Sequence, residues 1–128
     1  MIQTWLEVAR EARTAARRLM TEDNFRSCVS RSYYAAYSKV THELATTAGL
    51  TMPHDREGPH HTGGKGAIRP MIETSMPNMR GDRRAKLSEL IGRMYTLRLN
   101  ADYRPSIGVE GREAREAISM MNTVFESF

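Results

Sequence analysis

The sequence has 128 residues, the size of one domain, and its 40% hydrophobic and 27% charged residues are ordinary values for a globular protein. This composition excludes fibrous and disordered proteins, and no apolar run reaches the roughly 20 residues that cross a bilayer. The net charge of +4 permits an anionic partner without requiring one. With a single cysteine, Cys28, and no secretory leader, we expect one cytoplasmic domain over residues 1–128.

Apolar residues recur three and four positions apart through most of the chain, the spacing of helical faces. They predict helices over residues 4–20, 25–49, 67–75 and 82–103, and a last helix through residues 114–128. The second helix should be the longest. No strand-like alternation of useful length appears. We therefore expect an all-α fold, a four- to five-helix bundle with one long central helix.

A long loop rich in glycine, proline and histidine is predicted between residues 50 and 66, where periodicity stops. It contains His54, His60 and His61. Adjacent histidines in such a loop lack the spacing of a tetrahedral metal site, so we expect no metal, and nothing else in the sequence indicates a cofactor. A loop histidine that folds over a cleft could transfer protons, because its ordinary pKa of about 6.5 suits neutral pH.

Arg98 occupies a position where a bundle helix normally presents an apolar side chain, on the same stripe as Leu87, Ile91 and Met94. A buried guanidinium without a partner would be costly. Three interpretations follow: an ion pair with Asp102, four residues later; a phosphate-binding or catalytic arginine; or a rim position whose charge reaches water.

Three tyrosines lie within five residues in the segment Arg-Ser-Tyr-Tyr-Ala-Ala-Tyr, residues 31–37. Tyr33 and Tyr37 share one helical face, whereas Tyr34 is rotated by about 100° from Tyr33. At least one ring should therefore leave the core for a seam or interface. The segment predicts either aromatic packing with hydroxyls bonded at the margin, or a ligand or dimer contact.

The segment 31–37, followed by Leu-Arg-Leu-Asn-Ala-Asp-Tyr at residues 97–103, resembles the HEPN domains of prokaryotes over nearly the whole chain. The resemblance implies a helical bundle that forms a homodimer. It also implies RNA binding, and for many members a metal-independent ribonuclease activity in toxin-antitoxin or defence systems, often beside a nucleotidyltransferase-type partner protein. The usual active motif is an arginine followed about four to six residues later by a histidine.

Arg98 matches the motif arginine, but Tyr103 stands where the histidine is expected. An ordinary phenol has a pKa of about 10, so forming its base at neutral pH costs about 4 kcal/mol. The resemblance therefore implies that Arg98 binds the scissile phosphate and that Tyr103 donates a proton. His60 or His61 could act as the missing base. The predicted catalytic residues are Arg98 and Tyr103, and the predicted substrate-binding residues are Asn100, Asp102, Arg31, Tyr34, His60 and His61.

Three functions stay open at this point. The first is an RNA-associated protein with ribonuclease activity centred on Arg98. The second is a non-catalytic dimerisation or adaptor module, which the missing motif histidine favours. The third is a nucleotide-binding module, compatible with the basic charge but without a recognisable phosphate loop.

Overall fold

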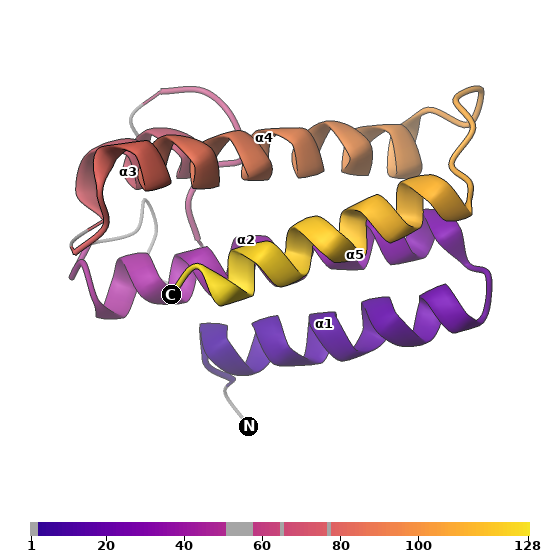
Figure 1. The fold of residues 1–128 in the computed structure, drawn as a ribbon, viewed down its shortest axis with the longest axis horizontal. Coiled ribbons are helices and arrows are strands. Elements are labelled where there is room, and N and C mark those ends of the chain that lie inside the picture. Colours follow the sequence, from indigo (N-terminus) through magenta and orange to yellow (C-terminus); the bar gives the residue numbers. More distant parts are fainter. Residues whose placement is uncertain (1–2, 51–57, 65, 77) are drawn as a thin grey trace.

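Five α-helices make up the fold. The computed structural model describes residues 3–50, 58–64, 66–76 and 78–128, and over these residues it contains no strand. The helices are α1 (Trp5–Thr21), α2 (Phe25–Thr46), α3 (Ile68–Ser75), α4 (Gly81–Tyr103) and α5 (Gly111–Glu126). Figure 1 shows α1, α5 and α4 as three long helices that cover α2, with α3 at one end of α4. The predicted all-α bundle is confirmed.

The central helix is α2, which packs against the other four helices. Eleven of its residues are buried, and they include small side chains such as Ala35, Ala36 and Ser38. A helix covered on several sides needs such residues around most of its circumference, because they let neighbouring helices approach closely. The prediction that α2 is the central helix is confirmed. The prediction that it is the longest helix is wrong, because α2 ends at Thr46 and has 22 residues, whereas α4 has 23.

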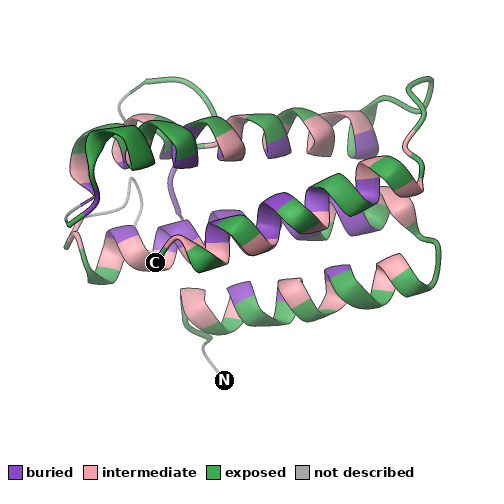
Figure 2. Ribbon diagram, in the orientation of Figure 1, coloured by how far each residue is buried: buried purple, intermediate pink, exposed green. Residues whose placement is uncertain are grey.

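The outer helices each turn one stripe inward, as Figure 2 shows by the purple faces that meet in the middle of the bundle. In α1 the buried residues are Ala9, Ala12 and Ala16, a stripe of small side chains against α2. The helix begins where the Thr4 side chain accepts a hydrogen bond of 3.1 Å from the amide of Glu7. None of the described helices is long and apolar enough to cross a membrane.

The buried side chains form two clusters. The larger joins α1, α2, α3, α4 and α5 around residues such as Tyr33, Ile72 and Ile91. The smaller contains Cys28, Val29, Ala101, Ala114 and Ala117, at the end of the bundle where α4 stops. Leu97 and Ile118 pack against both clusters, so the core is continuous. Leu97, which packs against both clusters, directly precedes Arg98 in α4.

Candidate functional site

Arg98 lies on the inner side of α4, facing α2, and its side chain is only 13% exposed. Its Nε atom lies 2.9 Å from Oδ2 of Asp102, one turn later on the same helix. Nε is buried and its N–H does not point at that oxygen, so the contact is an ion pair rather than a hydrogen bond. The predicted pairing of Arg98 with Asp102 is confirmed.

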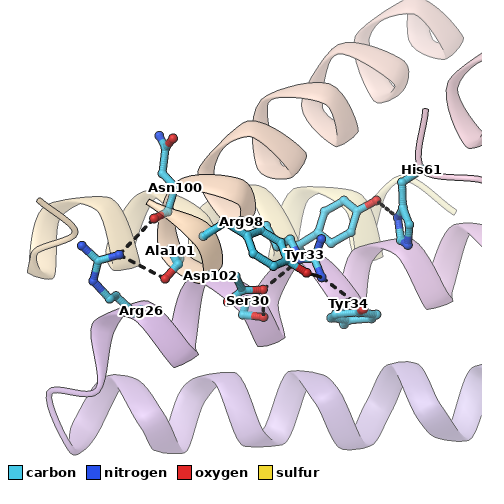
Figure 3. Close-up of polar contacts among 10 residues, drawn as sticks. Arg26, Ser30, Tyr33, Tyr34, His61, Arg98, Asn100, Ala101 and Asp102 are labelled. Carbon is cyan, nitrogen blue, oxygen red and sulfur yellow. Dashed lines mark hydrogen bonds and ion pairs between the residues drawn. The ribbon is translucent and has the colours of Figure 1, made fainter. Parts of the chain in front are cut away.

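Asp102 also connects α4 to α2. Its Oδ2 atom accepts a hydrogen bond of 3.1 Å from the hydroxyl of Ser30, which Figure 3 shows at the centre of the site. Burial lowers the pKa of Arg98, but electrostatic interactions with Tyr34, Tyr103 and Asp102 raise it. The second effect is larger, so the pKa lies above its ordinary value. The guanidinium is therefore a fixed cation held between the two helices.

Two phenols border the guanidinium of Arg98. Its Nη2 atom lies 3.5 Å from the Tyr34 hydroxyl and 3.4 Å from the Tyr103 hydroxyl. Its central carbon lies 5.6 Å from the ring centre of Tyr34 and 5.2 Å from that of Tyr103, within the range of cation–π attraction. Arg31 contacts the Tyr34 ring too, at 5.8 Å. Arg98, Tyr103, Asp102, Tyr34 and Arg31 thus gather at one place.

Asn100 is directed away from this group. Its side-chain oxygen accepts a hydrogen bond of 2.9 Å from Nη1 of Arg104, at the exposed end of α4. Two positions separate it from Arg98, so the helical rotation carries the two side chains to different faces. The substrate-binding role of Asn100 therefore stays a prediction, and no described contact joins it to Arg98.

Arg26 is a residue that the sequence did not single out. From the first turn of α2 its guanidinium donates hydrogen bonds to five backbone carbonyls around the end of α4. Figure 3 shows the bonds to Asn100 and Ala101. The acceptors are Asn100 at 2.9 Å, Ala101 at 3.1 Å, Arg104 at 3.4 Å, Pro105 at 3.3 Å and Ile107. These include last-turn carbonyls that a helix cannot pair by itself. Arg26 therefore fixes the segment that carries Asp102 and Tyr103.

His61 lies farther along α2, enclosed by aromatic rings. Its Nδ1 atom is 2.5 Å from the Tyr33 hydroxyl, and either ring tautomer satisfies this bond because a phenol both donates and accepts. The Tyr95 ring stacks on it at 5.8 Å with an interplanar angle of 7°, and the Tyr37 ring centre is 4.7 Å away. We name His61, Tyr33, Tyr37 and Tyr95 the histidine cage.

The loop reaches the cage through close backbone packing. The Tyr37 hydroxyl donates a hydrogen bond of 2.6 Å to the carbonyl of Pro59. A side chain at Gly58 would collide with this phenol, since a Cβ there would lie 2.3 Å from the hydroxyl oxygen. The amide of His60 bonds to the carbonyl of Gly66, and the carbonyl of His60 accepts from Ile68. These contacts direct His61 inward.

The loop histidines have different environments. His60 is exposed, whereas burial, followed by the charges of Arg98 and His60, lowers the pKa of His61 below its ordinary value. Neutral imidazole is therefore the favoured form of His61 at neutral pH. His54 lies outside the described residues. Within the described part of the chain, no three His, Cys, Asp or Glu side chains are grouped as metal ligands would be.

A pocket of about 370 Å³ opens between α1 and α2 beside this site. Tyr34 and Arg31 line it from α2, and Val8, Ala12 and Ala15 line it from α1. Tyr34 lies between this pocket and Arg98, because it lines the pocket while its hydroxyl contacts Nη2 of Arg98.

Comparison with known proteins gives no further information about this site. No family model matches the chain, no curated protein matches it, and no solved structure matches it with significance.

Proposed function

We propose that this chain is an RNA-binding protein of the HEPN type, in which Arg98 holds a phosphate of the RNA backbone. The proposal depends on which atoms of Arg98 already have partners in the structure. Its described contacts use Nε and Nη2, and no described residue bonds to Nη1. A cation fixed beside two phenol hydroxyls offers a phosphate three donors in one place.

The proposal extends to cleavage of the RNA without a metal. The 2′-hydroxyl oxygen attacks the adjacent phosphorus, forming a 2′,3′-cyclic phosphate, while the bond from phosphorus to the 5′-oxygen breaks. His61 takes the proton of the 2′-hydroxyl and Tyr103 gives one to the departing 5′-oxygen, so the products are a cyclic phosphate and a 5′-hydroxyl. Arg98 stabilises the charge that gathers on the phosphate oxygens.

His61 suits the role of base better than His60 does. The Tyr34 ring connects it to Arg98, with its centre 6.3 Å from the His61 ring and 5.6 Å from the Arg98 central carbon. Its lowered pKa keeps the imidazole neutral, the form that accepts a proton. Tyr103 is 64% exposed, which leaves its hydroxyl accessible to RNA.

The resemblance to HEPN domains supplies the wider setting of this proposal. It makes the chain a cytoplasmic homodimer in which two Arg98 sites face one cleft, as part of a toxin-antitoxin or defence system. A nucleotidyltransferase-type protein is the partner that the resemblance favours. The basic net charge of +4 agrees with an RNA substrate.

The test is binding and cleavage of a fluorescently labelled RNA by matched arginine variants. Arg98→Ala should weaken binding about tenfold and abolish cleavage. Arg80→Ala removes the same charge from the opposite end of α4, where Arg80 pairs with Asp82 on the surface, and should leave both unchanged. Equal effects of the two variants, or RNA left unbound by the wild-type protein, would refute the proposal.

A second candidate, the non-catalytic dimerisation or adaptor module, is favoured by the exposed apolar side chains beside the site. Tyr103, the last residue of α4, is 64% exposed, and Ile107, in the loop that follows α4, is 41% exposed. In this reading the Arg98–Asp102 pair is structural and the apolar side chains contact a second protein. Sedimentation of the wild type and of the variant Tyr103→Ser, Ile107→Ser tests it, because a monomer in both cases rejects the homodimer.

A further inference from the structure

The pocket between α1 and α2 has the size and lining of a small-ligand site. Its volume of about 370 Å³ lies within the range of roughly 300–1,000 Å³ that is typical of ligand pockets. Val8, Ala12 and Ala15 give it an apolar lining from α1. One wall carries an aromatic ring, Tyr34, with the cationic Arg31 beside it. Apolar surface next to an aromatic ring favours a flat, aromatic ligand.

Tyr34 connects this pocket to the proposed phosphate site. Its ring lines the pocket, while its hydroxyl lies 3.5 Å from Nη2 of Arg98. In Figure 3 the Tyr34 side chain lies below that of Arg98, beside α2. A base that stacks on an aromatic ring and a phosphate that binds a nearby arginine belong to one recurring arrangement for single-stranded RNA.

The polar rim of the pocket can read the edge of such a base. Gln3 and Glu11 line it, and Nε2 of Gln3 donates a hydrogen bond of 2.7 Å to Oε1 of Glu11. This bond orients the carboxylate, and no described residue bonds to its other oxygen, Oε2. An ionised carboxylate only accepts hydrogen bonds, so it selects for bases that present donors.

Guanine is the base that meets this requirement best. Its Watson–Crick edge carries two neighbouring donors, N1–H and the N2 amino group, which match an acceptor-only carboxylate. Adenine and cytosine each place a ring-nitrogen acceptor beside their amino group, and uracil flanks its N3–H with two carbonyl oxygens. An acceptor facing Glu11 would be repelled.

We propose that the pocket between α1 and α2 binds a guanine base of the RNA, stacked on Tyr34 and read by Glu11. The inference rests on the proposed function, because it names the nucleotide that lies next to the phosphate on Arg98. It assigns Tyr34 a stacking role and gives α1 a part in choosing the substrate. The cleavage site would then lie beside a guanosine.

The test is titration of the wild-type protein with guanosine, adenosine, cytidine and uridine 5′-monophosphates, followed by NMR chemical-shift changes. Guanosine monophosphate should bind most tightly and perturb the amides of the pocket. Tyr34→Ala should weaken it about tenfold to a hundredfold, whereas Tyr34→Phe, which keeps the ring, should retain the preference for guanine. Glu11→Gln should reduce that preference about tenfold, and Glu89→Gln, an exposed change on α4, should leave it intact.

The outcomes separate this inference from the proposed function. Equal binding of the four nucleotides, or an unchanged preference in Glu11→Gln, rejects the guanine pocket even where RNA binding still depends on Arg98. Guanine selectivity that depends on Glu11 and Tyr34 supports the pocket. If this selectivity persists while RNA binding is indifferent to Arg98→Ala, the pocket stands and the phosphate site is wrong.

Discussion

The first turns of α2 and its middle hold their neighbours by different physical means. In the first turns, the Arg26 guanidinium donates hydrogen bonds to backbone carbonyls at the end of α4, and the Ser30 hydroxyl donates one to the Asp102 carboxylate. In the middle of the helix, Tyr33 and Tyr37 hold the loop through buried rings and two short hydrogen bonds. The first contact is partly exposed, whereas Tyr33 and Tyr37 are buried.

This difference suits different tasks. Polar groups in a charged, partly exposed arrangement can exchange their partners for water or a ligand at modest cost. The hydroxyls of Tyr33 and Tyr37 belong to buried side chains, so losing a contact there leaves a desolvated polar group behind. The two regions therefore differ in how readily their polar groups can change partners. The variants below test whether the first turns and the middle of α2 differ in this way.

The largest effect is expected from Arg26→Met, which removes the guanidinium from the end of α4. Several last-turn carbonyls lose a charged donor together, and we expect the free energy of unfolding to fall by about 3 kcal/mol. Urea unfolding measures this loss. Arg112→Met, at an 85% exposed side chain, is the control and should change the stability little. A similar small change for Arg26→Met would mean that water replaces Arg26 without cost.

A slightly smaller loss is expected from Gly58→Ala, in the loop that packs on the middle of α2. The new methyl group would lie 2.3 Å from the Tyr37 hydroxyl oxygen and 3.3 Å from the Trp5 ring. Relieving this overlap must move the loop or the phenol, which we expect to cost about 2 kcal/mol. Thermal unfolding is the measurement, with Gly108→Ala as the control, because a Cβ there meets nothing closer than 3.9 Å. Equal melting temperatures for the two variants would contradict the tight packing of the loop.

Tyr33→Phe should cost about 1 kcal/mol, because it removes one hydrogen bond and leaves Nδ1 of His61 without its partner. The matched control is Tyr95→Phe, which keeps the ring stacked on His61 and deletes a hydroxyl without a described hydrogen bond. Urea unfolding of both variants gives the comparison. If Tyr95→Phe destabilises the protein as much, the Tyr33 hydroxyl has no special part in holding His61.

The smallest effect concerns pH. Burial, then the charges of Arg98 and His60, lowers the pKa of His61 in the folded protein from the ordinary 6.5. As the pH falls below 6.5, the unfolded chain takes up a proton that the folded chain resists, so stability decreases until the folded pKa is reached. His61→Gln should flatten this decrease below pH 6.5, whereas His60→Gln should leave most of it, because burial, the largest cause of the lowered pKa, remains. A wild-type stability without such a slope would contradict a half-buried, neutral His61.

The helices could be predicted because their signals are local. Apolar spacing of three and four residues marks α1, α4 and α5, and the breakers between residues 50 and 66 mark the loop. The end of α2 at Thr46 was missed, because Gly49 looked like the stop and helix ends are the least reliable feature of a pattern. The Arg98–Asp102 pair could also be predicted, because residues four positions apart on one helix are neighbours.

Contacts between different helices could not be predicted from local sequence patterns. Nothing about Arg26 indicates that it bonds to carbonyls more than seventy residues later, since any exposed arginine near a helix start looks alike. The sequence likewise does not show which of the two adjacent histidines, His60 or His61, points toward the tyrosines. The fold of the loop decides this, and it turns His61 inward. The sequence did not single out the partner of Asn100 either: its side chain accepts a hydrogen bond from Arg104, on a different helical face from Arg98.

The sequence by itself determined that this protein is a helical bundle, and that its helix around residues 30–44 and the helix ending in Arg98 to Tyr103 carry its unusual side chains. Only the tertiary structure decided which of these side chains meet. Periodicity depends on neighbours a few residues apart, whereas contacts between Arg98, Tyr34 and Ser30 depend on how separate helices pack. The pocket beside Tyr34 is of the same kind, because it exists only where α1 and α2 lie against each other.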